Sequence, residues 1–544
     1  MSSDMSMARG MHVLRVELYD TTLRDGTQGE GISFSVEDKL SIVRRLDQLG
    51  IDLIEGGWPG SNPKDAEFFE RAKDIELTHA RLTAFGSTRH HSRRAEEDPN
   101  LGAIVNSGVK TAAIFGKSWD FHVREALRTT LEENLRMIEE SIAFLVAQGL
   151  TVIYDAEHFF DGYKADSVYA LETLHAAARG GARTVCLCDT NGGCLPHEIY
   201  EITQHVRRVI DLPVGIHAHN DGGLGVANTL MAVRAGATHV QGTINGYGER
   251  AGNADMCQII PNLVLKMGHD CGVQIAGLTD LSRYVDDLAN VRPDSRRPFV
   301  GRSVFTHKGG IHVSAMLRKP ETYEHIDPSL VGNQRRVLVS ELSGAGNMIY
   351  KAQEYQIRLE KGSTALTRLL QAVKELEHEG YTFEGAEGSF ELLLKKSVGL
   401  YKPFFELVGL RVIIDKHSLD QEPITEASIK VRIGDRLVHT VAEGEGPVHA
   451  LDLALRRALG CVYPVINDIH LTDYKVRVVN EDAGTSAVVR VLIESAARGY
   501  TWNTVGVSAN LIEASWRALV DSIEYGLMIC EVQPQACVTA NDET

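Results

Sequence analysis

The first half of the chain alternates between short apolar runs and longer segments whose apolar residues are spaced three and four positions apart. Eight runs rich in β-branched residues recur, at residues 13–20, 51–57, 80–86, 109–116, 150–157, 182–189, 212–219 and 237–244. Each run has the length of a buried strand, and helical periodicity separates most of them. Eight strands alternating with helices predict a parallel sheet that closes into a (β/α)₈ TIM barrel, an α/β fold.

Three of the intervening segments have the clearest helical pattern, residues 35–49, 129–147 and 222–235. In the first, Glu37 and Asp38 lie in the first turn and Gly50 follows the last apolar residue. Acidic residues favour the beginning of a helix and glycine its end. We therefore expect this helix to begin at Ser35 and to end at Leu49.

The repeat stops near residue 280, and the rest of the chain has a different organisation. Residues 345–400 have apolar positions at helical spacing. The last part contains two similar copies of several strands followed by one helix, residues 406–460 and 474–527. We therefore predict a barrel domain (12–280), a mostly helical linker with lid subdomains (281–404) and a C-terminal α+β domain (405–544) with a binding or dimerising role.

Composition excludes some partners. The 544 residues are 43% hydrophobic and 24% charged, as in ordinary globular proteins, and the net charge is −17. Nucleic acid and anionic membrane attract basic surfaces, so neither is an expected partner. The tail 1–10 has no apolar run, and nothing approaches the roughly 20 apolar residues of a membrane span. We expect a cytoplasmic protein.

Eight cysteines are scattered along the chain, and none forms the Cys-x-x-Cys pair of zinc clusters or redox motifs. They are expected to be reduced residues of the protein core, as in other cytosolic proteins. Cys186 and Cys188 share one face of a predicted strand, where packing is a more frequent role than metal binding.

A carboxylate and two imidazoles suggest a metal site. Asp25 follows the first strand, and His217 and His219, two positions apart, leave the same face of the seventh. One carboxylate and two imidazoles suit a divalent cation. Arg24, beside Asp25, presents a permanent charge to a developing oxyanion. A surface ion pair and buried packing histidines are the alternative interpretations.

The barrel prediction brings further residues to the same place, because active sites of this fold lie at the carboxyl ends of the strands. Glu157 ends the fifth strand, and Asp189 with Thr190 ends the sixth. After the eighth strand, the segment 245–253 (NGYGERAGN) allows tight turns and ends in Asn253, a neutral oxygen ligand. Its alternative interpretation is a structural turn.

The segment 304–328 mixes glycine and histidine with the basic residues Lys308, Arg318 and Lys319. This composition suits a lid or an arm over a phosphate-bearing cofactor. A solvated linker is the alternative.

Five motifs occur in barrel order: YDTTLRDG (19–26), YDAEHFFDGY (154–163), CDTNGG (188–193), HAHND (217–221) and NGYGERAGN (245–253). With them the chain resembles, over nearly its whole length, the Claisen-condensing acyltransferase family of 2-isopropylmalate, homocitrate and citramalate synthases. The resemblance implies condensation of acetyl-CoA with a 2-keto acid, here pyruvate, and hydrolysis of the thioester. It also implies a divalent ion (Mn, Mg or Zn) held by Asp25, His217 and His219, with Asn253 completing or supporting the ligand shell.

The resemblance assigns further roles. Arg24 would bind substrate and stabilise the alkoxide, Glu157 and Thr190 would orient the reactants, His312 would be the base, and Tyr323 would assist thioester hydrolysis. In the family the segment that carries the last two reaches the barrel of a partner subunit, which implies a homodimer or a higher homo-oligomer. The C-terminal domain resembles a regulatory domain, with isoleucine as the implied allosteric inhibitor.

Three alternatives remain open on the sequence alone. 2-Isopropylmalate synthases act on the longer acceptor 2-ketoisovalerate and usually carry His-Gln-Asp where this chain has His312-Val313-Ser314. 3-Hydroxy-3-methylglutaryl-CoA lyases share the arginine, aspartate and histidine residues but carry a cysteine in a glycine-rich loop, where this chain has GERAGNADM. The third alternative is an amino-acid sensor that has lost turnover.

Overall fold

A computed structural model describes residues 13–416, 418 and 422–530. The N-terminal tail 1–10 and Cys537, on which two of the sequence expectations fall, lie outside these residues. Within the described part of the chain, no helix combines the length and the apolar character needed to cross a membrane.

Eight parallel strands close into a barrel in sequence order, as predicted. Each lies within or overlaps one of the eight apolar runs: β1 (Glu17–Asp20), β2 (Leu53–Gly57), β3 (Arg81–Ser87), β4 (Thr111–Lys117), β5 (Thr151–Glu157), β6 (Thr184–Asp189), β7 (Val214–Ala218) and β8 (His239–Gly242). β8 pairs with β1 and so closes the sheet. All residues of β2, β6, β7 and β8 are buried, as is typical of strands covered by helices.

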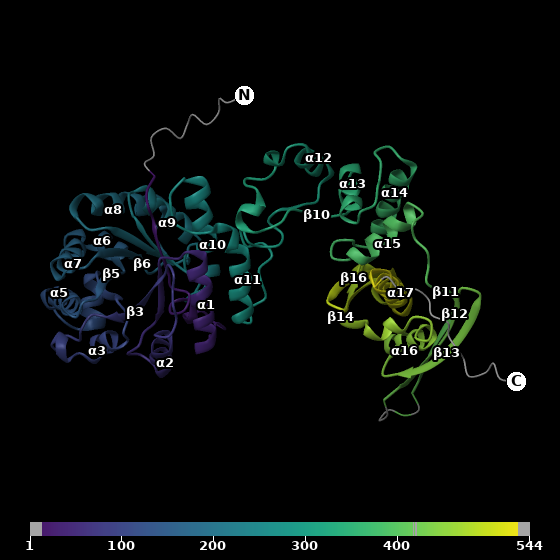
Figure 1. Ribbon diagram of the computed structural model, residues 1–544, viewed down its shortest axis with the longest axis horizontal. Helices are drawn as coiled ribbons and strands as arrows, with labels where there is room; N and C mark the ends of the chain where they lie inside the picture. Colours follow the sequence, from purple (N-terminus) through teal and green to yellow (C-terminus); the bar gives the residue numbers. More distant parts are fainter. Residues whose placement is uncertain (1–12, 417, 419–421, 531–544) are drawn as a thin grey trace. The chain divides into compact units, whose positions relative to one another are not determined.

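Helices surround this barrel in Figure 1: α1 (Val36–Leu49), α2 (Pro63–Ala72), α3 (Pro99–Asn106), α4 (Asp120–His122), α5 (Leu131–Ala147), α6 (Phe159–Ala165), α7 (Ser167–Gly180), α8 (Pro196–Val209), α9 (Gly225–Arg234), α10 (Met256–Pro261) and α11 (Leu278–Leu288). The prediction for α1 is confirmed. Ser35 caps it in a reciprocal pair with Asp38, and Gly50 ends it with a φ of 99°, which favours glycine.

The chain divides into two compact units. The first comprises Met1–Phe305 and Ile326–Gln334, and the second comprises Thr306–His325 and Arg335–Thr544. The second unit contains a two-stranded parallel pair and four helices before the C-terminal repeat: β9 (Thr306–His307), α12 (Gly310–Arg318), β10 (Arg336–Val337), α13 (Ala345–Glu354), α14 (Thr364–His378) and α15 (Glu387–Ser397). The helical prediction for 345–400 is thus confirmed.

The C-terminal repeat is also confirmed, and each copy is an antiparallel three-stranded sheet followed by a helix. The first copy contains β11 (Glu406–Asp415), β12 (Ile424–Ile433), β13 (Arg436–Gly444) and α16 (Pro447–Leu459), and the second contains β14 (His470–Val478), β15 (Val489–Ala497), β16 (Tyr500–Ser508) and α17 (Leu511–Ile529). Apolar residues of both copies form one shared core. This domain is α+β, as the sequence predicts.

The expectation of reduced cysteines holds for six of the eight: Cys186, Cys188, Cys194, Cys257, Cys271 and Cys530 are free thiols. It is wrong for Cys461, which is disulfide-bonded. Spacing could not reveal this bond, because no Cys-x-x-Cys or similar signal marks either end of it.

Candidate active site

One cavity at the carboxyl ends of the strands contains six of the predicted barrel residues: Arg24, Asp25, Glu157, Thr190, His217 and His219. The cavity has a volume of about 220 Å³ and is lined by Arg24, Asp25, Gln28, Trp58, Phe85, Phe115, Asp155, Glu157, Cys188, Thr190, His217, His219 and Glu249. Residues almost two hundred positions apart therefore share one pocket. Barrel closure alone accounts for this, because parallel strands deliver all their carboxyl ends to one face.

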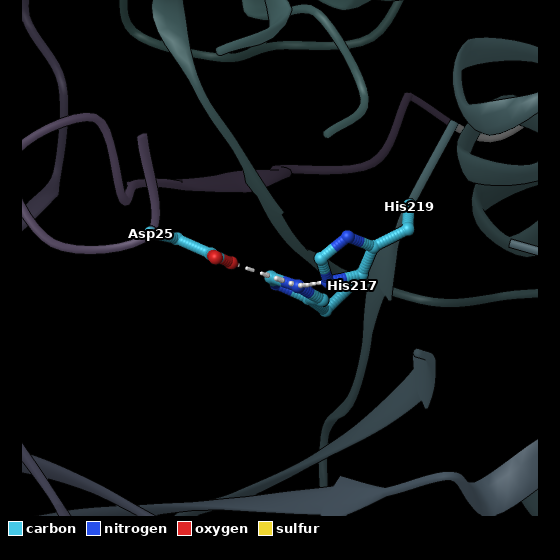
Figure 2. A group of neighbouring side chains, drawn as sticks. All are labelled: Asp25, His217 and His219. Atoms are coloured by element: carbon cyan, nitrogen blue, oxygen red, sulfur yellow. Dashed lines mark hydrogen bonds and ion pairs between the residues drawn. The ribbon is translucent and has the colours of Figure 1, made fainter. Parts of the chain in front are cut away.

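Asp25, His217 and His219 point toward one another (Figure 2) and are buried. The Nε2 atom of His217 lies 3.2 Å from Asp25 Oδ2 and 3.3 Å from Nε2 of His219. Ligands that bind one cation at about 2.1 Å lie about 3.0 to 3.4 Å from each other. The three groups are thus spaced like neighbouring ligands of a single divalent ion.

Unpaired polar atoms beside this cluster support the same conclusion. An antiparallel bridge joins His219 to Asn253. Among the described residues, Asn253 Oδ1 and His219 Nδ1 are buried side-chain atoms without a hydrogen-bond partner. A buried polar group without a partner is costly, and a cation bound by His219 Nε2 would supply the partner that Asn253 Oδ1 lacks. The donor set, with carboxylate and amide oxygens and two imidazoles, fits a divalent metal.

Electrostatics favours the ligand form of Asp25 and of His219. For His217, burial lowers the pKa, but the hydrogen bond and the charge of Asp25 outweigh burial and raise it. Burial opposes ionisation of Asp25, but the Arg24 charge and the hydrogen bond to His217 outweigh it and hold the pKa of Asp25 well below its usual range. Burial, with a contribution from His217, lowers the pKa of His219 to about 4. At neutral pH the site therefore presents a carboxylate and a neutral imidazole, as metal binding requires.

Arg24 is fixed at the edge of the same pocket by three neighbours. Its Nε donates to Glu55 at 2.5 Å, Nη1 lies 3.6 Å from Asp25 Oδ1, and the guanidinium carbon lies 3.7 Å from the centre of the Phe85 ring. Tyr19 donates its hydroxyl hydrogen to the other oxygen of Glu55. The guanidinium of Arg24 is thereby held rigidly where an oxyanion would develop.

Glu157 and Thr190 line the cavity from neighbouring strand ends. Glu157 pairs with Lys117, which lies opposite it in the β4–β5 register. The Thr190 hydroxyl accepts the backbone N–H of His158 at 2.9 Å. Asp189, also at this strand end, accepts the backbone N–H groups of Gly193 and Cys194 and so has a structural role.

The loop 245–253 needs its glycines to bring Asn253 to the site. Gly248 has a φ of 153°, and a Cβ there would lie 2.1 Å from Asn253 Nδ2. Gly252 has a φ of 87°, and a Cβ there would lie 2.0 Å from the carbonyl oxygen of Gly246. Only glycine allows both the conformation and the close approach. The turn is therefore structural and also positions a candidate ligand.

Sequence reasoning missed four polar residues around this site: Glu55, Lys117, Asp155 and Gln241. Glu55, Asp155 and Gln241 are fully or almost fully buried inside the barrel. A usable signal was present, because each is a polar side chain inside an otherwise apolar strand run, which is costly unless it is paired. Lys117 gave no such signal, because it stands at the end of its strand.

His312 and Tyr323 belong to the second unit. His312 lies on α12, and its ring stacks on that of Tyr323 with centroids 4.4 Å apart. Both side chains are exposed, Tyr323 to 45%. The structure thus brings these two residues together on a surface, and the other predicted residues together in the barrel.

A closed parallel barrel with a carboxylate, two imidazoles and a guanidinium in one pocket defines the class, a TIM-barrel protein with a candidate metal site. Residues 15–285 match the HMGL-like family, 299–380 match the homocitrate synthase post-HMGL domain-like family, and 384–527 match the LeuA allosteric (dimerisation) domain.

The (R)-citramalate synthase of Geobacter sulfurreducens is 53% identical over 514 residues, which cover 94% of this chain and 97% of that protein. That of Aquifex aeolicus is 53% identical over 517 residues, covering 94% and 98%. A probable 2-isopropylmalate synthase of Methanopyrus kandleri is 32% identical over 509 residues, covering 94% and 98%. The chain belongs to the citramalate synthase family of HMGL-like acyltransferases and is an enzyme.

Proposed function

We propose that the enzyme condenses acetyl-CoA with pyruvate and hydrolyses the thioester, giving citramalate and free CoA. The observation that carries this proposal is the convergence of Asp25, His217 and His219 in the barrel of a chain that matches citramalate synthases over nearly its full length. The acetyl methyl group loses a proton, its carbon bonds to the keto carbon of pyruvate, and water then cleaves the thioester.

In this proposal Asp25, His217, His219 and Asn253 hold a divalent ion, which is Mn, Mg or Zn. When bound, the ion polarises the keto group and binds the carboxylate of the acceptor. Arg24 faces the same oxygen atoms and offsets the negative charge that forms on the keto oxygen. Glu157 and Thr190 orient the reactants from the ends of β5 and β6.

The pocket itself supports a short acceptor. Trp58 packs edge-on against both Phe85 and Phe115, and these three rings wall the cavity of about 220 Å³. A longer keto acid needs more room, and each methylene of an acceptor is worth about 1–3 kcal/mol of discrimination. Aromatic walls of this kind disfavour 2-ketoisovalerate.

We further propose that His312 removes the methyl proton and that Tyr323 assists thioester hydrolysis, each acting on the barrel of a partner subunit. A neutral histidine suits proton transfer near pH 7. Exposure of both rings on one surface is compatible with a role across a subunit interface. This division assigns chemistry to residues 12–280, the proton-transfer arm to 281–404 and regulation to 405–544.

Regulation by isoleucine is part of the proposal, with the C-terminal domain as its site. The match of residues 384–527 to an allosteric and dimerisation domain supports it. Feedback of this kind requires a coupling free energy between the effector site and the barrel. A cytoplasmic location is also proposed, since six cysteines are free thiols.

A free-thiol assay tests the reaction. The protein is incubated with acetyl-CoA and one of several 2-keto acids, with and without a chelator, and with and without isoleucine. Release of CoA with pyruvate, abolished by the chelator and reduced by isoleucine, is the expected result. Release only with 2-ketoisovalerate would instead identify a 2-isopropylmalate synthase, and silence with every acid would favour a lyase or a sensor.

A further inference from the structure

Gln241 on β8 lies next to His217 on β7, in register, and is completely buried. Its side chain is hydrogen-bonded to His217 and Asp155, which both line the cavity. We propose that Gln241 is a positioning residue that accepts the Nδ1 hydrogen of His217 and so directs Nε2 of that imidazole to the metal ion. The inference rests on the proposed metal site and adds to it a residue that acts through one of the candidate ligands.

The amide of Gln241 makes three contacts inside the barrel. Its Oε1 lies 3.0 Å from His217 Nδ1, its Nε2 donates to Asp155 Oδ1 at 2.8 Å, and the same Nε2 lies 3.4 Å from His239 Nε2. An amide nitrogen has two hydrogens and an amide oxygen has none. The two ends of this side chain are therefore chemically distinct, and their neighbours decide which end faces His217.

His239 decides that orientation together with Asp155. The Nδ1 atom of His239 lies 2.9 Å from a carboxylate oxygen of Glu17, which can only accept, so the hydrogen of this imidazole is on Nδ1. Its Nε2 is then an acceptor for Gln241. His239 Nε2 and the Asp155 carboxylate are thus two acceptors that both face the Gln241 amide nitrogen. If the amide were reversed, its oxygen would face the Asp155 carboxylate, and the repulsion between them excludes that orientation.

The carboxylate of Glu17 is held in its ionised form at the amino-terminal end of the barrel. Arg183 donates to it at 2.8 Å and Arg81 at 3.2 Å. Gly215 makes room for the His239 ring, since a Cβ at that position would lie 2.7 Å from His239 Cδ2. A hydrogen-bonded chain therefore runs inside the barrel from Glu17 through His239 and Gln241 to His217.

The consequence appears at the metal-binding end of this chain. Since the Gln241 oxygen can only accept, His217 must donate from Nδ1, and a neutral imidazole then has a free lone pair on Nε2. That lone pair faces Asp25 and His219. In the other tautomer the hydrogen would be on Nε2 and would point at the metal ion. Partners of this kind behind metal-binding histidines are worth about 10–100-fold in metal affinity.

Titration of the metal-free full-length protein with Mn²⁺ tests this, with free Mn²⁺ measured by electron paramagnetic resonance. Gln241→Met keeps the length of the side chain and removes the acceptor, and we expect it to weaken binding by about 10–100-fold. Ile153→Val is the matched control, because Ile153 is also buried in the barrel interior and its apolar side chain forms no hydrogen bond. It removes one methylene and no hydrogen bond, and it should change the affinity less than about twofold.

A pair of double variants separates tautomer control from packing. In Gln241→Glu with Asp155→Asn, the introduced carboxylate accepts from His217 Nδ1 and the introduced amide donates to that carboxylate, at unchanged net charge. Gln241→Met with Asp155→Asn lacks this acceptor and also the carboxylate charge, so Asp155→Asn alone is measured beside it to give the effect of the charge. We expect Mn²⁺ affinity within about threefold of wild type in the first and a loss of about 10–100-fold in the second.

Near-ultraviolet circular dichroism verifies that each variant is folded. Equal affinities of the two double variants, or wild-type affinity of Gln241→Met, would overturn the inference while leaving the proposed function intact. Failure of the wild-type protein to bind Mn²⁺ would overturn both. Because no substrate is present, a wrong assignment of the keto acid would not affect the result.

Discussion

Arg24 has little freedom to move, because each part of its guanidinium already has a neighbour. Glu55 accepts from Nε, Asp25 lies beside Nη1, and Phe85 covers one face of the plane. Arg24 also lines the cavity. A planar group held in this way can stabilise a negative charge without reorganising, which is the usual source of a large effect on a transition state.

Arg24→Lys should therefore lower kcat by about 10²–10³-fold while metal content stays at the wild-type level. Lysine keeps the charge but loses the planar group that fits between Glu55 and Phe85. Thiol release and bound metal are measured on the same sample. Arg45→Lys is the control, since Arg45 forms an exposed ion pair with Asp280. Loss of the metal from Arg24→Lys would refute a direct role in catalysis.

His312→Ala should lower the rate of condensation by about 10²–10⁴-fold, as loss of a general base does, and leave pyruvate binding unchanged. Single-turnover kinetics and pyruvate titration measure the two quantities. His378→Ala is the control, because His378 is an exposed residue at the end of α14 in the same unit.

Mixing His312→Ala with Asp25→Ala chains adds a second test. If the base acts across the subunit interface, a mixed dimer has one site with both residues intact, and activity returns on mixing. Full activity of His312→Ala alone would show that another group is the base, and absence of recovery in proven mixed dimers would show that it acts within its own chain.

At the residue scale, the candidate metal ligands could be predicted from the sequence, but the side chains that hold these ligands in position could not. Asp25, His217 and His219 could be found because the barrel prediction brings a carboxylate and two imidazoles, each ambiguous alone, to the same face. Gln241 is marked in the sequence only as a polar residue within an apolar strand run, and its role becomes clear only when its neighbours in the barrel are known. Side-chain partners depend on strand register and closure, which no local pattern contains.

At the element scale, the barrel seam depends on one carboxylate. Glu17 is the first residue of β1 and pairs with His239 of β8 in register. It also accepts from Arg81 of β3 and from Arg183 just before β6. Burial works against ionisation, but His239 and Arg183 outweigh it and lower the pKa of Glu17 from 4.5 to about 2.

This shift predicts a loss of stability in acid. The unfolded carboxyl takes up its proton near pH 4.5 and the folded one only near pH 2, so the stabilisation is complete above 4.5 and is lost as the pH falls to 2. Glu17→Gln should lower the unfolding midpoint clearly at about pH 6 and by less as the pH approaches about 3. Thermal unfolding across this range measures the difference.

Glu76→Gln, on the exposed surface, is the control and should have the same midpoint as wild type throughout. A deficit of Glu17→Gln that stays constant with pH would mean that the side chain acts through packing and not through its charge.

The helices and strands themselves were largely predictable. An element that packs against the same kind of neighbour along its whole length has apolar residues at a regular spacing. All eight barrel strands follow this rule, as do α1, α5 and α9. The segment 304–328 does not. It folds as the two-residue strand β9, the short helix α12 and irregular turns, and such short elements owe their structure to tertiary neighbours.

At the scale of the whole molecule, two of the four edge strands in the described part of the C-terminal domain, β11 and β14, need a partner. β11 and β14 each end a three-stranded sheet. They expose large apolar side chains, among them Val408 at 50%, Ile414 at 58% and Val478 at 52%. An uncovered apolar edge strand promotes association, and proteins usually cover it or place charges on it. A second copy of this domain would provide the cover, in agreement with the match to a dimerisation domain.

Ile414→Lys combined with Val478→Lys should therefore convert a dimer into a monomer, since lysine on an edge strand opposes association. Light scattering after gel filtration measures the mass, and the thiol assay measures activity on the same fractions. Val168→Lys is the matched control, because Val168 on α7 is 73% exposed and lies on the barrel.

If His312 serves a partner subunit, the monomer loses turnover but keeps Mn²⁺ binding, since all candidate ligands belong to one chain. A double variant that remains a dimer would show that other surfaces hold the subunits together, and a monomer with full turnover would show that each chain is catalytically complete.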